Sequence, residues 1–93
     1  MKIIVGIPMD DYDNFVERCD AARPEYEMLK NGIITQDREK RRAVEILCEL
    51  EDAKMILDLA SEICPHAVPH VEESISLARG LRSVTWQRHI AKP

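Results

Sequence analysis

Apolar residues recur at helical spacing over the first third of the chain. The stripe consists of Tyr12, Phe15, Cys19, Ala22, Tyr26 and Leu29, which follow one another at steps of three and four. It predicts a helix from Asp10 or Asp11 to about residue 30. The stripe keeps its phase across Pro24, so we expect a kink there rather than a break. Asn31 and Gly32 then provide the left-handed residue that commonly ends a helix.

A longer apolar pattern runs through the middle of the chain. Its seam is Ala43, Ile46, Leu50, Ala53, Leu57, Ala60 and Cys64. This spacing predicts a second helix over roughly 36–64, and the short connection makes it fold back on the first as an antiparallel hairpin. A second stripe is formed by Val44, Cys48, Met55, Leu59 and Ile63. It lies about 150° around the predicted helix from the seam, so one hairpin partner cannot cover both faces.

The two ends of the chain carry strand patterns. Lys2 to Ile7 is a mostly β-branched run that favours a short buried strand, and residues 81–90 alternate in the manner of a half-buried strand. A third helix is expected over about 69–79, with Pro69 at its start and Gly80 at its end. Its inward residues would be Val71, Ile75 and Ala78. The expected fold is therefore mainly α within the α+β class: an antiparallel helical hairpin, a third helix, and short N- and C-terminal strands in one domain, 1–93.

Composition narrows the classes of function. The chain has 93 residues, 45% of them apolar and 32% charged, and a formal net charge of −4. Nucleic-acid binding is disfavoured because phosphate binding needs a positive surface. No apolar run is long enough to span a membrane, and three cysteines do not form a disulfide framework. We therefore expect a cytoplasmic protein that binds neither nucleic acid nor membrane and carries no cofactor.

The segment CPHAVPH, residues 64–70, is the clearest candidate for chemistry. Cys64, His66 and His70 have the side chains that bind transition metals, and Glu73 follows one helical turn later. Their spacing is not that of a standard site. The same segment also ends one predicted helix and begins the next, so the plainer interpretation is a corner between helices.

Other polar and reactive residues have structural explanations. The acidic residues between Asp10 and Glu27 are typical of a solvated helix face. Cys19 and Cys48 are interpreted as packing residues, with a redox-sensitive pair as the alternative. The last residues are basic and include Trp86, but one aromatic residue is too few for stacking on nucleic acid.

These patterns lead to three functional hypotheses. The first is a non-catalytic protein–protein interaction or regulatory module that acts as a homodimer, because the long helix is apolar on more faces than a short chain can bury. Its predicted interaction surface is Val44, Cys48, Met55, Leu59, Ile63 and Trp86. The second is a small metal-binding or metal-sensing protein that uses Cys64, His66 and His70. The third is an acidic inhibitor or small regulatory subunit that docks on a larger enzyme.

Overall fold

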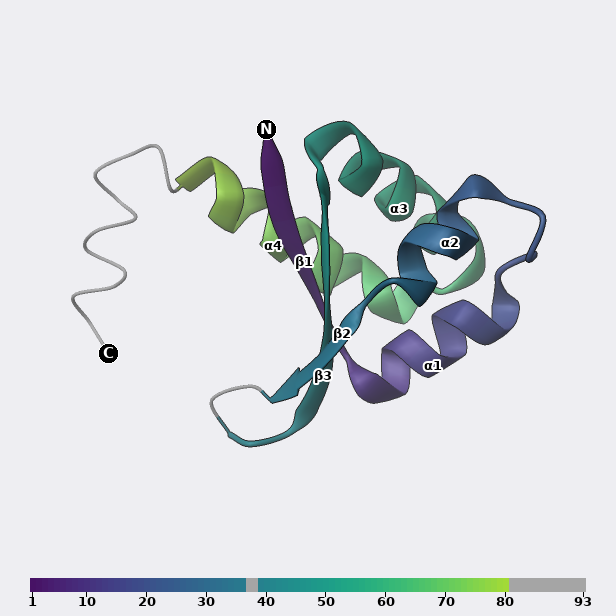
Figure 1. Ribbon diagram of the computed structural model, residues 1–93, viewed down its shortest axis with the longest axis horizontal. Helices are drawn as coiled ribbons and strands as arrows, with labels where there is room; N and C mark the ends of the chain where they lie inside the picture. The colour runs from purple at the N-terminus through teal and green to yellow at the C-terminus, as the bar shows by residue number, and fades with distance from the viewer. Residues whose placement is uncertain (37–38, 81–93) are drawn as a thin grey trace.

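The computed structural model describes residues 1–36 and 39–80 (Figure 1). In chain order the elements are β1 (Lys2–Pro8), α1 (Met9–Arg18), α2 (Pro24–Lys30), β2 (Ile33–Gln36), β3 (Arg42–Glu49), α3 (Leu50–Ile63), a 3-10 turn (Pro65–Ala67) and α4 (Val68–Gly80). The α+β class predicted from the sequence is confirmed. Among the described helices, none is long and apolar enough to cross a membrane.

The three described strands form one antiparallel sheet in the order β1-β3-β2. Residue Ile3 lies opposite Cys48 on one side of β3, and Ile33 lies opposite Glu45 on the other. Because β3 is antiparallel to both neighbours, β1 and β2 are parallel to each other and are joined through α1 and α2. This is a split β-α-β arrangement, in which a third strand lies between the two parallel ones. It leaves β1 and β2 as the two edges of the sheet.

The predicted helix over 36–64 is wrong, and with it the antiparallel helical hairpin. Strands occur in the middle of the chain as well as at its start, and the helix in this region begins only at Leu50. Along β3 the burial alternates: Val44 and Ile46 are buried, whereas Glu45 and Leu47 are exposed. A strand places successive side chains on opposite faces, and this alternation decides the structure of the segment.

The first predicted helix is divided in two rather than kinked. α1 ends at Arg18, and α2 begins with Pro24 at its first helical position, where a missing N–H costs no hydrogen bond. α2 ends where expected, but Asn31 has φ −83° and the glycine after it is not left-handed either. Position 32 requires glycine because no side chain fits there: a Cβ would collide with Cγ1 of the buried Val44 side chain.

Two predicted elements are confirmed. β1 includes the predicted strand, and α4 covers the predicted third helix with its expected inward face buried. These inward residues join side chains from the sheet and the other helices in one core, which includes Val5, Phe15, Leu29, Ile56 and Val71. The predicted strand over 81–90 lies outside the described residues.

The helices leave one face of the sheet open. On β1, Ile3, Val5 and Ile7 are all nearly inaccessible because they point into the core. Ile4 on the same strand and Leu47 on β3 point the other way and remain largely exposed. In the described part of the chain, the sheet therefore buries one face and presents apolar side chains on the other.

Candidate functional site

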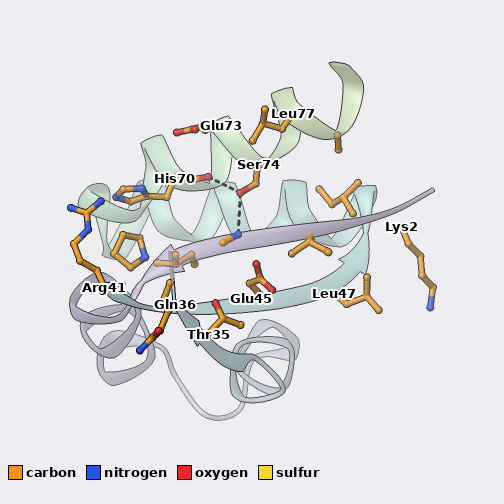
Figure 2. Close-up of a pocket in the computed structure, with 17 residues that line it drawn as sticks. Lys2, Thr35, Gln36, Arg41, Glu45, Leu47, His70, Glu73, Ser74 and Leu77 are labelled. Carbon is orange, nitrogen blue, oxygen red and sulfur yellow. Dashed lines mark hydrogen bonds between the residues drawn. The ribbon is translucent and has the colours of Figure 1, made fainter. Parts of the chain in front are cut away.

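The outer edge of β1 is covered by α4. The Gly6 backbone N–H donates a hydrogen bond to Ser74 Oγ over 3.0 Å, and this hydroxyl donates to the His70 carbonyl over 2.9 Å (Figure 2). Pro8 ends the strand and has no N–H to satisfy. An open sheet edge is a template for pairing with another chain, and a covering helix removes that template. The contact between α4 and β1 thus closes one edge of the sheet.

A groove lies between α4 and the open face of the sheet, with a volume of about 830 Å³ (Figure 2). Its floor includes Ile4, Gly6 and Leu47, and its wall on α4 includes Ser74 and Leu77. Ile4 and Leu47 lie directly opposite each other on adjacent strands and are 55% and 65% exposed. We use the name groove for this site.

Charged residues of both signs also line the groove. Glu45 and Glu73 come from β3 and α4, and Lys2 and Arg41 lie toward its two ends (Figure 2). Arg41 forms an ion pair with Glu39 at 3.3 Å. The groove therefore combines an apolar floor with a balanced set of charges: two acidic side chains and, toward each end, one basic side chain.

Gly6 leaves a depression in the floor of the groove. A Cβ at this position would meet no atom of the described residues within 4 Å. Glycine inside a strand weakens it and often marks a place where another group approaches closely. The fold itself does not require glycine here for space, in contrast to Gly32.

The opposite edge of the sheet is bare. β2 pairs with β3 on one side and is the last strand in the sheet order. Its first two residues, Ile33 and Ile34, are 68% and 58% exposed, although they point to opposite faces. We call these two side chains the edge patch. Within the described residues, nothing covers this edge as α4 covers β1.

The interaction surface predicted from the sequence is divided by the fold. Val44, Cys48 and Leu59 are buried in the core of the chain. Met55 is 38% exposed on α3, and Ile63 at the end of that helix is half-buried. Trp86 lies outside the described residues.

The three predicted metal ligands are not gathered into one site. The Cys64 thiol is buried and donates a hydrogen bond to the Asp11 carbonyl at 3.8 Å. His70 Nε2 lies 3.2 Å from the Asp11 carboxylate, whereas His66 is exposed. Among the described residues, no group of three or more His, Cys, Asp or Glu side chains could hold a metal ion.

The other two cysteines lie in environments that favour packing over reactivity. Cys19 and Cys48 are both buried and free. Burial raises the pKa of the Cys19 thiol, and nearby Glu25 acts in the same direction. Burial also raises the pKa of the Cys48 thiol, with a further contribution from Asp52. A raised pKa keeps a thiol protonated, and the protonated form is a poor nucleophile.

Two polar contacts hold the crossover helices. The Tyr12 hydroxyl donates to the Leu29 carbonyl at the end of α2 over 2.6 Å. Burial raises the pKa of this phenol, so the donor stays protonated. At the start of α2, Glu25 is almost fully buried and pairs with Arg23 at 3.3 Å. The hydrogen bond from Arg23 lowers the pKa of the Glu25 carboxyl.

Sequence reasoning missed both the groove and the edge patch. The available signal was the alternation in RAVEILCE, residues 42–49, which was assigned instead to a helical seam through Ala43 and Ile46. A strand at these positions would have placed the Leu47 side chain on the face of the sheet that points away from the core. The isoleucines after Gly32 would then have been assigned to the first strand of a hairpin, with residues 42–49 as its second strand.

Comparison of the chain with known protein families, with curated proteins and with solved structures finds no significant match. The groove and the edge patch are therefore the features from which a function can be inferred.

Proposed function

We propose that the chain is a non-catalytic interaction module that forms a homodimer through the outer edge of β2. The observation that supports this proposal is that one edge of the sheet is covered by a helix and the other is not. α4 covers β1 and satisfies the Gly6 N–H, whereas β2 presents two adjacent isoleucines that are more than half exposed. Natural proteins protect sheet edges that must stay unpaired, with charges, proline or a covering element.

A second copy of the chain suits this edge. Two β2 strands related by a two-fold axis would pair antiparallel, and the same residues would then meet on both sides of the axis. Pairing would satisfy the outward backbone groups of β2 and extend the sheet across both copies. Ile33 and Ile34 point to opposite faces, so apolar contacts would form above and below the joined sheet.

The absence of a catalytic role is supported by the state of the reactive side chains. Ser74 is occupied by two hydrogen bonds between α4 and β1. The Cys19 and Cys48 thiols are buried with raised pKa values. These groups hold the fold together and are poorly placed to attack a substrate.

Sedimentation equilibrium over a range of concentrations tests the proposal. The wild-type chain should have the mass of a dimer at high concentration and dissociate on dilution. Ile33→Lys should shift the equilibrium to the monomer, because two lysines would be placed at the joined edge. Leu47→Lys is the matched control: it changes a residue of similar exposure outside β2 and should leave the dimer intact. A wild-type mass of one chain at every concentration would refute the proposal.

A further inference from the structure

The described part of the chain ends beside the groove. Leu77 and Ala78, in the last turns of α4, line the groove, and α4 continues to Gly80. Figure 2 shows Arg41 and His70 at one end of the groove and Lys2 at the other, with Leu77 displaced from Ser74 toward the Lys2 end. Residues 81–93 therefore start at the rim of an apolar surface.

We propose that residues 81–93 lie in the groove of their own chain, with the Trp86 indole over Gly6. The segment is long enough to extend along the whole groove. Fully extended, its thirteen residues span at most about 45 Å, whereas a seven-residue strand such as β1 is about 23 Å long. A turn after Gly80 uses only a few residues and leaves enough chain to run the length of the floor.

The sequence of the segment complements the groove. Val84, Trp86 and Ile90 fall on one side of an alternating sequence pattern. In the proposed arrangement these side chains would cover the exposed side chains of Ile4 and Leu47. All seventeen Asp and Glu residues precede residue 81, whereas three of the thirteen Lys and Arg residues follow Gly80. The chain up to Gly80 thus carries −7 and the segment +3. These opposite net charges attract the segment to the rest of the chain, and Glu45 and Glu73 offer its basic side chains partners within the groove.

The depression at Gly6 suits an aromatic ring. Among residues 1–36 and 39–80, no atom lies within 4 Å of the place that a Cβ on Gly6 would take. An aromatic side chain packed over a strand glycine covers the exposed backbone and compensates for the missing side chain. Trp86 is the one tryptophan of the chain. Because the segment is covalently attached, its effective concentration at the groove is in the range of about 1 mM or more, so modest contacts suffice.

Trp86 also makes the proposal measurable in the full-length chain. Its fluorescence emission and its quenching by acrylamide should show a shielded indole in the native protein and an exposed one in guanidinium chloride. Leu47→Lys places a positive charge on the floor of the groove and removes an apolar contact. We expect it to move the emission maximum toward that of the unfolded chain and to raise the quenching constant several-fold, while far-UV circular dichroism stays unchanged.

The control is Ile33→Lys, a substitution of similar exposure on the same sheet that lies outside the groove. It should leave Trp86 shielded. The proposal is overturned if native Trp86 is quenched as in the unfolded chain, or if the two lysine variants change its emission equally. It is also overturned if the shielding disappears on dilution, because the segment would then belong to a second copy. Failure of the homodimer would show in the sedimentation mass and leave these fluorescence outcomes unaffected.

Discussion

The hydroxyl of Ser74 connects α4 to the edge of β1, and replacing it with alanine tests how much that connection stabilises the fold. The substitution removes two hydrogen bonds, one donated to the His70 carbonyl within α4 and one accepted from the Gly6 N–H. The bond within the helix contributes little, because the carbonyl keeps its helical partner and alanine favours helices. The strand N–H, which is partly buried, loses its acceptor.

Ser61 provides the matched control. Its hydroxyl donates to the Leu57 carbonyl over 3.0 Å, the same contact four residues back in a helix, but it accepts no hydrogen bond from any of the described strands. An orphaned, partly buried donor costs about 1–3 kcal/mol. We therefore expect Ser74→Ala to lower the free energy of unfolding by about 1–2 kcal/mol more than Ser61→Ala does. For a chain of this size each kcal/mol corresponds to roughly 4–8 °C in Tm.

Urea denaturation of the two variants and the wild type gives the free energies, and amide hydrogen exchange gives the local effect. In Ser74→Ala the Gly6 amide should exchange faster, while amides of β3 in the middle of the sheet should change only with global stability. Equal destabilisation by the two substitutions, together with an unchanged Gly6 exchange rate, would refute the role given to Ser74 at the sheet edge.

Three further substitutions test individual contacts. Gly32→Ala should destabilise the chain by about 1–3 kcal/mol in urea unfolding, because its Cβ would collide with the buried Val44 side chain. Tyr12→Phe should cost about 1 kcal/mol in the same assay by removing the hydroxyl that holds the end of α2. Glu25→Gln should reduce stability at neutral pH. Since the pKa of Glu25 is lowered in the folded state, its stabilisation is present above the unfolded pKa of about 4.3 and is lost as the pH falls through the folded value, so the unfolding curves of wild type and variant should converge in acid.

The elements predicted correctly have a single strong local signal. Residues 2–7 are mostly β-branched and too few for a helix, and α4 is marked by Pro69 near its start and by inward residues at helical spacing. In both, the local pattern and the packing of the whole chain favour the same structure.

The middle of the chain was mispredicted because two periodicities overlap there. Ala43, Ile46 and Leu50 continue the helical spacing of α3 backward into β3. The same segment also alternates through Val44, Ile46 and Cys48, which all enter the core. Pairing with β1 and β2 decides between these patterns, and such contacts between distant parts of the chain cannot be read from local spacing.

Which residues form the candidate surfaces also depends on whether residues 42–49 are a helix or a strand. Once residues 42–49 are a strand, Val44 and Cys48 move from the predicted interaction surface into the core. Leu47 then appears on the open face, and the isoleucines of β2 lie at a sheet edge. The general expectation of surplus apolar surface remains, but other residues supply it.

Amide hydrogen exchange along β2, followed at several protein concentrations, tests the proposed edge pairing most directly. Every second N–H of Ile33–Gln36 faces away from β3, where the described chain offers no pairing strand. The account predicts that these outward amides are protected at concentrations that favour the dimer, and that dilution or Ile33→Lys removes the protection. Outward amides that exchange at unprotected rates at every concentration, including those at which the protein sediments as a dimer, would contradict it.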